Sequence, residues 1–133
     1  MTNALRMRLV LAGLLTCAPA RADWTPVAPD NGIYSAYADR STVRRDGPYA
    51  TMLGLYDFTR GDFTPDGARY FSTTVEREYD CRERRVRLVR YTDHAERLGR
   101  GVIVTAAEGR RRWEAVVDGS LDAVYWKIAC EGA

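Results

Sequence analysis

Hydrophobic and polar residues after Asp23 alternate in short runs that turn-forming residues separate. Such runs, rich in Val, Tyr and Thr, are typical of β-strands, whose side chains point alternately to the two faces of a sheet. The pattern predicts strands over residues 24–28, 33–38, 42–45, 49–58, 68–80, 84–92 and 101–107.

Turn chemistry supports these boundaries. Residues 30–32 (Asp-Asn-Gly) and 46–47 (Asp-Gly) favour tight turns, and residues 59–67, with two glycines and a proline, predict a loop. Within residues 49–58, Met52, Leu53 and Leu55 carry apolar side chains on both faces. This predicts a central strand that is covered on each side.

The last segment changes period from two to about 3.6, which predicts an amphipathic helix. Ser120, preceded by Gly119, suits the N-cap of this helix. Cys130 would lie about 180° around an ideal helix from the first residue of the apolar stripe. Two outcomes stay open: the helix ends before Cys130, or both of its faces are covered. The stripe consists of Leu121, Val124, Tyr125 and Ile128.

Residues 1–22 have the features of a secretory signal peptide. Arg6 and Arg8 precede the apolar run 9–17, and Ala20 and Ala22 occupy the two positions that signal peptidase recognises. The apolar run is about half of the roughly 20 residues that a membrane span needs. We therefore expect cleavage before Asp23, export, and no transmembrane span.

Cys17 stands at the end of this apolar run, where a lipid-acceptor cysteine would lie. Thr16 before it is larger than the residue usual at that position, and a good cleavage site follows. Lipid anchoring at Cys17 is therefore the less favoured alternative.

Cleavage would leave residues 23–133 as one domain of 111 residues, large enough for a core but not for a second lobe. This part has 17 basic and 18 acidic residues, a net charge of −1. Because no global positive field remains, we expect no nucleic-acid partner, and a cationic site would have to be local.

Only Cys81 and Cys130 remain in the cleaved chain. Two cysteines in an oxidising compartment have one intramolecular pairing, so we expect a disulfide between them. It would fasten the predicted helix to the end of the strand over residues 68–80. A zinc site would need about four ligands, and the chain adds only His94 to the two cysteines.

Residues 77–90 (REYDCRERRVRLVR) are the most charged stretch of the chain. If Arg82 and Glu83 form a turn, antiparallel pairing places Asp80 opposite Arg85, Glu78 opposite Arg87, and Tyr79 opposite Val86. The charges would then compensate in pairs. A solvated sheet face is the favoured interpretation, and a polar recognition surface is the alternative.

The sequence lacks the constellations that enzymes need. His94 is the only histidine, and its neighbour Asp93 should point to the opposite face of a strand. Glu76 and Glu78 have arginine neighbours that would keep both ionised, which removes a general acid. Gly99-Arg100-Gly101 precedes a β-branched run rather than the helix of a nucleotide-binding loop. We predict no enzyme activity, no catalytic or metal-binding residues and no cofactor.

The sharpest candidate for partner binding is the run Arg110, Arg111, Arg112 and Trp113, because arginine beside tryptophan is frequent at binding hot spots. It could hold an acidic protein segment, a sulfated glycan or an anionic lipid headgroup. Arginine is far commoner than lysine throughout the chain, so a solvated turn is the competing interpretation.

The order of these motifs resembles the surface-adhesin protein E family of proteobacterial envelope proteins. The matching text is Trp24 soon after the signal peptide, residues 38–47 (ADRSTVRRDG), residues 79–88 (YDCRERRVRL), Trp113, and Gly119-Ser120 leading to Cys130. The resemblance covers residues 23–133. It implies an α+β fold: a single antiparallel sheet of about six strands with a C-terminal helix held by the Cys81–Cys130 disulfide. Family members are exported, and their namesake activity is adhesion to host extracellular matrix proteins.

We therefore expect an exported, adhesin-like module that contacts a protein or glycan at the cell surface, in the periplasm or on the outer surface of a Gram-negative bacterium. A homodimer is compatible with this role. The alternative is a periplasmic accessory protein or small-ligand carrier without adhesive activity. A cavity of about 300 Å³ or more between helix and sheet would favour the carrier.

Overall fold

The computed structural model describes residues 21–132. The predicted signal peptide therefore lies outside the described residues except for Arg21 and Ala22, and so does Cys17. The described chain forms β1 (Trp24–Ala28), β2 (Tyr34–Asp46), β3 (Tyr49–Phe63), β4 (Arg69–Asp80), β5 (Arg85–His94), β6 (Ile103–Glu108), β7 (Glu114–Ala115) and α1 (Leu121–Glu131).

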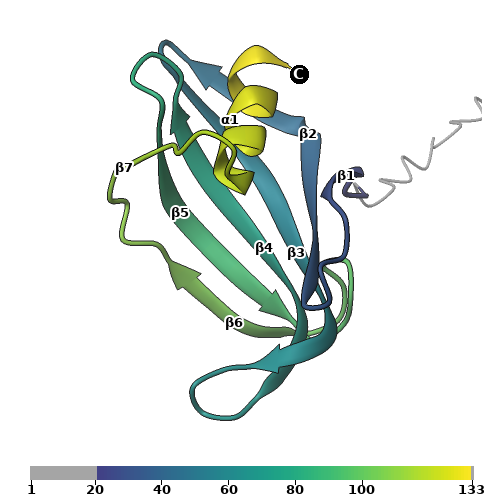
Figure 1. Cartoon of the computed structure of the whole chain (residues 1–133). Helices are drawn as coiled ribbons and strands as arrows, with labels where there is room; N and C mark the ends of the chain where they lie inside the picture. The colour runs from purple at the N-terminus through teal and green to yellow at the C-terminus, as the bar shows by residue number, and fades with distance from the viewer. Residues whose placement is uncertain (1–20, 133) are drawn as a thin grey trace, which may run out of the picture.

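All strands belong to one antiparallel sheet. Strands β1 to β6 follow one another in spatial as well as sequence order, and β7 pairs with β5 beyond the end of β6. Helix α1 lies across one face of this sheet, near the β2–β3 and β4–β5 turns, while the β3–β4 hairpin extends from the opposite end (Figure 1). The α+β fold with one antiparallel sheet and a C-terminal helix is confirmed, and β7 is a short strand that the sequence pattern does not predict.

The face that α1 covers, called the helix face below, holds the main apolar core. It forms because alternate residues of β2, β3 and β4 point to the same side. Tyr125 of α1 is fully buried there, and Gly54 makes room for its ring, since a Cβ on Gly54 would lie 3.2 Å from Tyr125 Cε1. The other core residues include Ala36, Ala38, Ala50, Met52, Tyr79, Val86, Trp126 and Ile128.

The helix begins and ends where its cap residues indicate. The Ser120 side chain accepts a hydrogen bond from the backbone N–H of Ala123, and Gly132 closes the C-terminus in the left-handed conformation. The helix runs past Cys130, so it does not end before this residue, and its covered side is wider than the predicted stripe, while Val124, Lys127 and Glu131 form an exposed side. Trp126 is buried outside the predicted stripe, whereas Val124, which belongs to the stripe, is 41% exposed.

The predicted disulfide is present between Cys81 and Cys130, whose Cα atoms are 5.4 Å apart. It joins the β4–β5 turn to the last turn of α1. Two further contacts cross the same junction: Trp126 Nε1 donates to the Asp80 carbonyl at 2.9 Å, and Arg45 Nη1 donates to the Cys130 carbonyl at 3.2 Å. The helix is therefore held at its C-terminal end by covalent and polar links.

The predicted strands at residues 33–38 and 42–45 are one continuous strand, β2. Its pairing with β3 shifts register between Asp39 and Arg44, and local side chains stabilise this irregularity. Thr42 Oγ1 donates to the Asp39 carbonyl at 2.6 Å and accepts from the backbone N–H of Leu53 at 2.9 Å. The polar residues that suggest an interruption therefore form a bulge.

The predicted loop at residues 59–67 is too long, because β3 continues to Phe63. The β3–β4 pairing shifts register between Asp57 and Asp62. Gly61 lies in this irregular stretch with φ of +72°, and a Cβ there would lie 2.8 Å from the Tyr70 carbonyl. The hairpin turn itself spans residues 64–68, closed by a bond from Thr64 N to the Ala68 carbonyl at 2.8 Å.

The segment between β5 and β6, residues 95–102, packs over the sheet face opposite α1. The buried Asp57 carboxylate accepts bonds from Arg97 Nε at 2.9 Å and from the Leu98 N–H at 2.8 Å. Buried Ser72 donates to the Glu96 carbonyl and accepts from the Gly99 N–H. Both faces of β3 and β4 are thus covered in part, which agrees with the predicted central strand.

None of the helices in residues 21–132 has both the length and the apolar character needed to cross a membrane.

Candidate partner-binding site

The charged β4–β5 hairpin has the predicted register. Asp80 lies opposite Arg85, Tyr79 opposite Val86, and Glu78 opposite Arg87. Arg85 Nη2 lies 2.7 Å from Asp80 Oδ2, and Arg87 Nη2 lies 2.5 Å from Glu78 Oε1. The acids and bases of this hairpin compensate each other in the predicted pairs, but Asp80 is buried, so this face is solvated only in part.

Asp80 has a second role at the turn. Its Oδ1 accepts bonds from the backbone N–H groups of Arg82 and Glu83 at 3.1 and 2.9 Å. The hydrogen bond from Arg85, joined by these two N–H groups, holds the pKa of Asp80 below its ordinary value. The Asp80 carboxylate therefore stays charged and fixes the turn that carries Cys81.

Trp113 lies apart from the three arginines that precede it. Its ring stacks on Tyr49 at a centroid distance of 5.7 Å, and the Cζ atoms of Arg85 and Arg87 lie 5.1 and 4.3 Å from its centroid. Tyr49, Arg85 and Arg87 share the sheet face opposite α1, by their cross-strand pairing. Trp113 therefore anchors its segment to that face.

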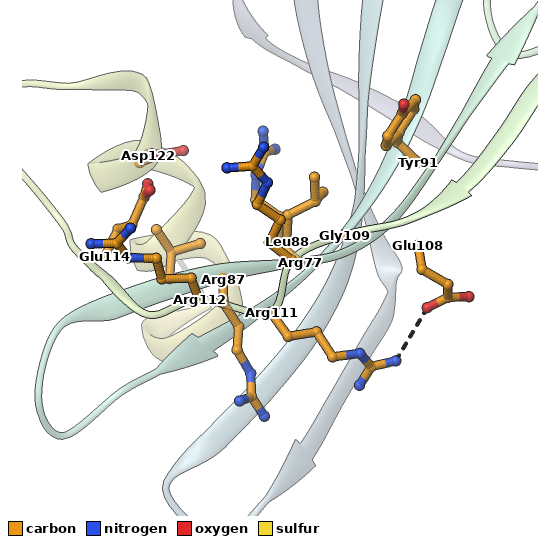
Figure 2. A pocket seen from close by; sticks show the side chains of 12 residues that line it. Arg77, Arg87, Leu88, Tyr91, Glu108, Gly109, Arg111, Arg112, Glu114 and Asp122 are labelled. Carbon is orange, nitrogen blue, oxygen red and sulfur yellow. Dashed lines mark hydrogen bonds and ion pairs between the residues drawn. The ribbon is translucent and has the colours of Figure 1, made fainter.

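A hollow of about 530 Å³ lies on the other side of the same segment, beside α1 (Figure 2). We call it the arginine hollow. Its floor includes Val86, Leu88 and Tyr91 of β5. Three acids also line it: Glu108, Glu114 and Asp122 of α1. The arginines that line it are Arg77 of β4 and Arg110, Arg111 and Arg112 of the segment that joins β6 to β7; Arg87 of β5 borders it, but its guanidinium lies over Trp113 on the opposite face.

The rim segment, residues 109–113, is held against β5 by backbone hydrogen bonds. Gly109 N donates to the Val89 carbonyl at 2.8 Å, and Arg111 N donates to the Leu88 carbonyl at 3.2 Å. A Cβ on Gly109 would lie 2.3 Å from the Leu88 carbonyl oxygen, so only glycine fits at this approach. This close contact sets the position of the three rim arginines.

The three rim arginines are exposed and differ in their partners. Arg111 Nη2 lies 3.4 Å from Glu108 Oε2, a loose pair on the rim (Figure 2). Within residues 21–132, Arg110 and Arg112 form neither an ion pair nor a side-chain hydrogen bond. They therefore carry charge that the described fold does not compensate by contact.

Arg77 of β4 contributes a positive charge to the hollow from the helix face of the sheet. Its guanidinium lies over the rings of Tyr56 and Tyr125, at 5.5 and 5.8 Å from their centroids, and its Nη2 donates to Tyr56 Oη at 3.2 Å. Its Nη1 is buried without a hydrogen-bond partner in the described structure. Burial disfavours its charge, but the tyrosines and Asp122 outweigh burial and hold the pKa of Arg77 above its ordinary value.

Arg77 is not among the site residues that the sequence predicts, although the sequence carries a signal for it. Period-two alternation places it between Val75 and Tyr79 on the helix face, so an arginine occupies an apolar position. The sequence predicts Arg87 only as the partner of Glu78. No sequence signal marks Asp122 as a neighbour of these arginines, because the approach of α1 depends on packing.

The residues considered for catalysis stay apart. His94 contacts Thr74 through Nε2 and Oγ1 at 3.0 Å, while Asp93 accepts a bond from Thr73 on the other face. Burial lowers the pKa of His94, against an opposing effect of Asp93. Glu76 pairs with Arg90 at 2.9 Å. In residues 21–132, no three His, Cys, Asp or Glu side chains gather as metal ligands would.

The residues of the nucleotide-loop fragment, Gly99 to Gly101, lie in the segment that covers the sheet face opposite α1. The interface between α1 and the sheet is filled by Tyr125, Met52 and Tyr79, each with at most 1% of its surface exposed. The arginine hollow lies beside α1, not beneath it, and charged side chains form much of its wall. An enclosed apolar pocket for a small-ligand carrier is therefore not favoured.

The sequence profile of the surface-adhesin protein E family matches residues 24–131. Among solved structures, the crystal structure of protein E from non-typeable Haemophilus influenzae has a TM-score of 0.65 and 13% identity, over 84% of this chain and 78% of that one. Crystal form II of Haemophilus influenzae protein E has a TM-score of 0.64 and 13% identity, over 73% and 80%. At such identities the likeness concerns the fold. No curated protein matches the chain.

Proposed function

Because this chain belongs to the surface-adhesin protein E family, we propose that it is an exported, adhesin-like binding protein that holds an acidic segment of a partner protein in the arginine hollow. The observation that carries the proposal is the pair Arg110 and Arg112, which have no ionic partner in the described fold and stand on the rim of a hollow of about 530 Å³. The family supports a role in binding host partners.

Arginine suits such a role because its planar guanidinium can bind a carboxylate through two hydrogen bonds and retains its charge at any physiological pH. The rest of the described chain neutralises many of its arginines in ion pairs, as in Arg85 with Asp80 and Arg97 with Asp57. Arg110 and Arg112 form no ion pair within residues 21–132, and, unlike other unpaired arginines such as Arg40, Arg60 and Arg82, they line the arginine hollow. A net charge of −1 for residues 23–133 makes this a local positive site in a near-neutral domain.

The mixed lining favours a protein segment over a sulfated glycan. Glu108, Glu114 and Asp122 would repel a densely sulfated chain. A peptide can place carboxylates on Arg110 and Arg112, and apolar side chains on Val86, Leu88 and Tyr91 of the floor. We therefore place protein ahead of glycan as the partner, and we propose no catalytic step.

We expect the variant Arg110→Ser, Arg111→Ser, Arg112→Ser to lose about 10-fold or more in affinity for immobilised extracellular-matrix protein, about 1.4 kcal/mol of binding free energy. The fold should persist, because Gly109 N and Arg111 N attach the segment through the backbone. Binding can be measured by surface plasmon resonance at two salt concentrations, and the affinity of the wild type should fall as salt rises.

A matched control changes Arg40, Arg60 and Arg82 to serine, because these side chains are exposed and removed from the hollow. It has the same change in charge and should bind like the wild type. Equal loss in both triple variants would indicate an unspecific effect of charge and contradict the site. If only binding to heparin depended on the rim arginines, a sulfated glycan would replace protein as the proposed partner.

We further propose that the domain is displayed on the outer surface of the cell rather than kept in the periplasm. Addition of trypsin to intact cells should degrade this protein while a periplasmic marker survives, as followed by immunoblot. Degradation only after the outer membrane is permeabilised would place the protein in the periplasm and restore the accessory role as the better proposal.

A further inference from the structure

The first described residues lie beside a buried carboxylate. The backbone N–H of Asp23 donates a hydrogen bond to Asp39 Oδ2 at 3.1 Å. Asp39 belongs to β2 and has 3% of its surface exposed. Trp24, the next residue along the chain, is its cross-strand partner in β1. The N-terminal edge of the domain therefore places a backbone nitrogen directly at this side chain.

Asp39 has no cation to balance its charge within residues 21–132. Its Oδ1 accepts from the backbone N–H and the Oγ of Ser41, at 3.0 and 2.5 Å, while the Asp23 N–H is the one described donor to Oδ2. A buried carboxylate is costly when no positive charge compensates it. Of the other buried carboxylates, Asp57 and Asp80 each have an arginine, while Asp93 accepts a hydrogen bond from Thr73 Oγ1.

Cleavage of the peptide bond before Asp23 would supply the missing charge. A signal peptidase uses one water molecule to break the bond between the Ala22 carbonyl carbon and the Asp23 nitrogen. The hydroxyl of that water completes a carboxyl group on Ala22, and a proton goes to the Asp23 nitrogen. At neutral pH the new amine takes up a further proton, because α-amino groups titrate near pH 8.

We propose that cleavage between Ala22 and Asp23 completes this site, so that the α-ammonium group of Asp23 forms an ion pair with the buried carboxylate of Asp39. The fold then distinguishes a correctly processed N-terminus from an extended one. An uncleaved chain, or one cleaved elsewhere, presents a neutral amide at the same place. Processing and stability of the domain are thereby linked, independently of what the arginine hollow binds.

The test compares two chains that differ by one residue. One begins at Asp23 and the other keeps Ala22, which turns the ammonium group into an amide; both contain every described strand and the helix. We expect the chain that begins at Asp23 to melt about 5 °C higher. The difference should disappear when both chains carry Asp39→Asn, and it should persist when they carry Asp46→Asn, an exposed carboxylate of the same strand.

Equal melting temperatures of the two chains with Asp39 intact would overturn the proposal. If Asp39→Asn fails to fold, acetylation of the α-amine of the chain that begins at Asp23 replaces it, and this neutral form should melt like the longer chain. The mass of the protein recovered from exporting cells is the second measurement. A chain that begins at Asp23 supports the proposal, and a chain that begins at any other residue, such as a lipidated Cys17, contradicts it.

Discussion

Replacement of Cys130 by serine is expected to lower the free energy of unfolding by about 4 kcal/mol. The disulfide with Cys81 closes a loop across a sequence separation of 49 residues, and its loss frees the unfolded chain to adopt many more conformations. Such a loss is a large fraction of the net stability of a domain of this size. Unfolding in urea, followed by circular dichroism with and without a reducing agent, measures it.

Cys81→Ser is the matched variant, and the two single variants should be equally unstable because each removes the same bond. The reduced wild type should unfold like both of them. If reduction left the urea midpoint of the wild type unchanged, the disulfide would contribute nothing measurable and the prediction would be wrong.

Replacement of Tyr125 by alanine is expected to cost about 3–5 kcal/mol, the range for removal of a large buried ring. The side chain is fully buried against Gly54 and Arg77, and its hydroxyl donates to the Tyr37 carbonyl at 2.9 Å. Tyr125→Phe keeps the ring and loses only this hydrogen bond, so it should cost about 1 kcal/mol. Thermal and chemical unfolding of both variants check the two values.

Val124→Ala is the control for helix propensity at the neighbouring position, because Val124 is 41% exposed. It should change stability by about 0.5 kcal/mol or less. A cost for Val124→Ala comparable to that of Tyr125→Ala would mean that α1 presents a different face to the sheet.

The sequence predicts features that depend on local chemistry. The hairpin register follows from alternating charges, so Asp80 pairs with Arg85 as expected. Ser120 caps α1 because its hydroxyl reaches the Ala123 N–H within one turn. The disulfide follows from counting cysteines. Each of these predictions needs only neighbouring residues or an elimination of alternatives.

The sequence does not predict structural features that depend on contacts between residues far apart in the chain. Residues 39–41 resemble a break, but Thr42 Oγ1 accepts a bond from the Leu53 N–H of β3, and β2 is continuous. The candidate site also has one part that the local sequence predicts and one part that it does not. The rim arginines are visible in the sequence, whereas the hollow beneath them depends on the close approach of Gly109 to Leu88 and on the position of α1. Arg77 is the exception, because an arginine at an apolar position of the strand pattern could have identified it as a candidate site residue.

The position of α1 after every strand in chain order has a consequence for biogenesis. An exported chain that leaves the translocation channel N-terminus first presents α1 after all of its strands, so the helix face of the sheet has no cover until α1 emerges. Cys81 emerges long before Cys130 and remains a free thiol in the meantime. Folding of the domain can therefore be completed only after α1 has emerged, and until then the early thiol is open to attack by a periplasmic oxidoreductase, which would protect it as a mixed disulfide until its partner emerges.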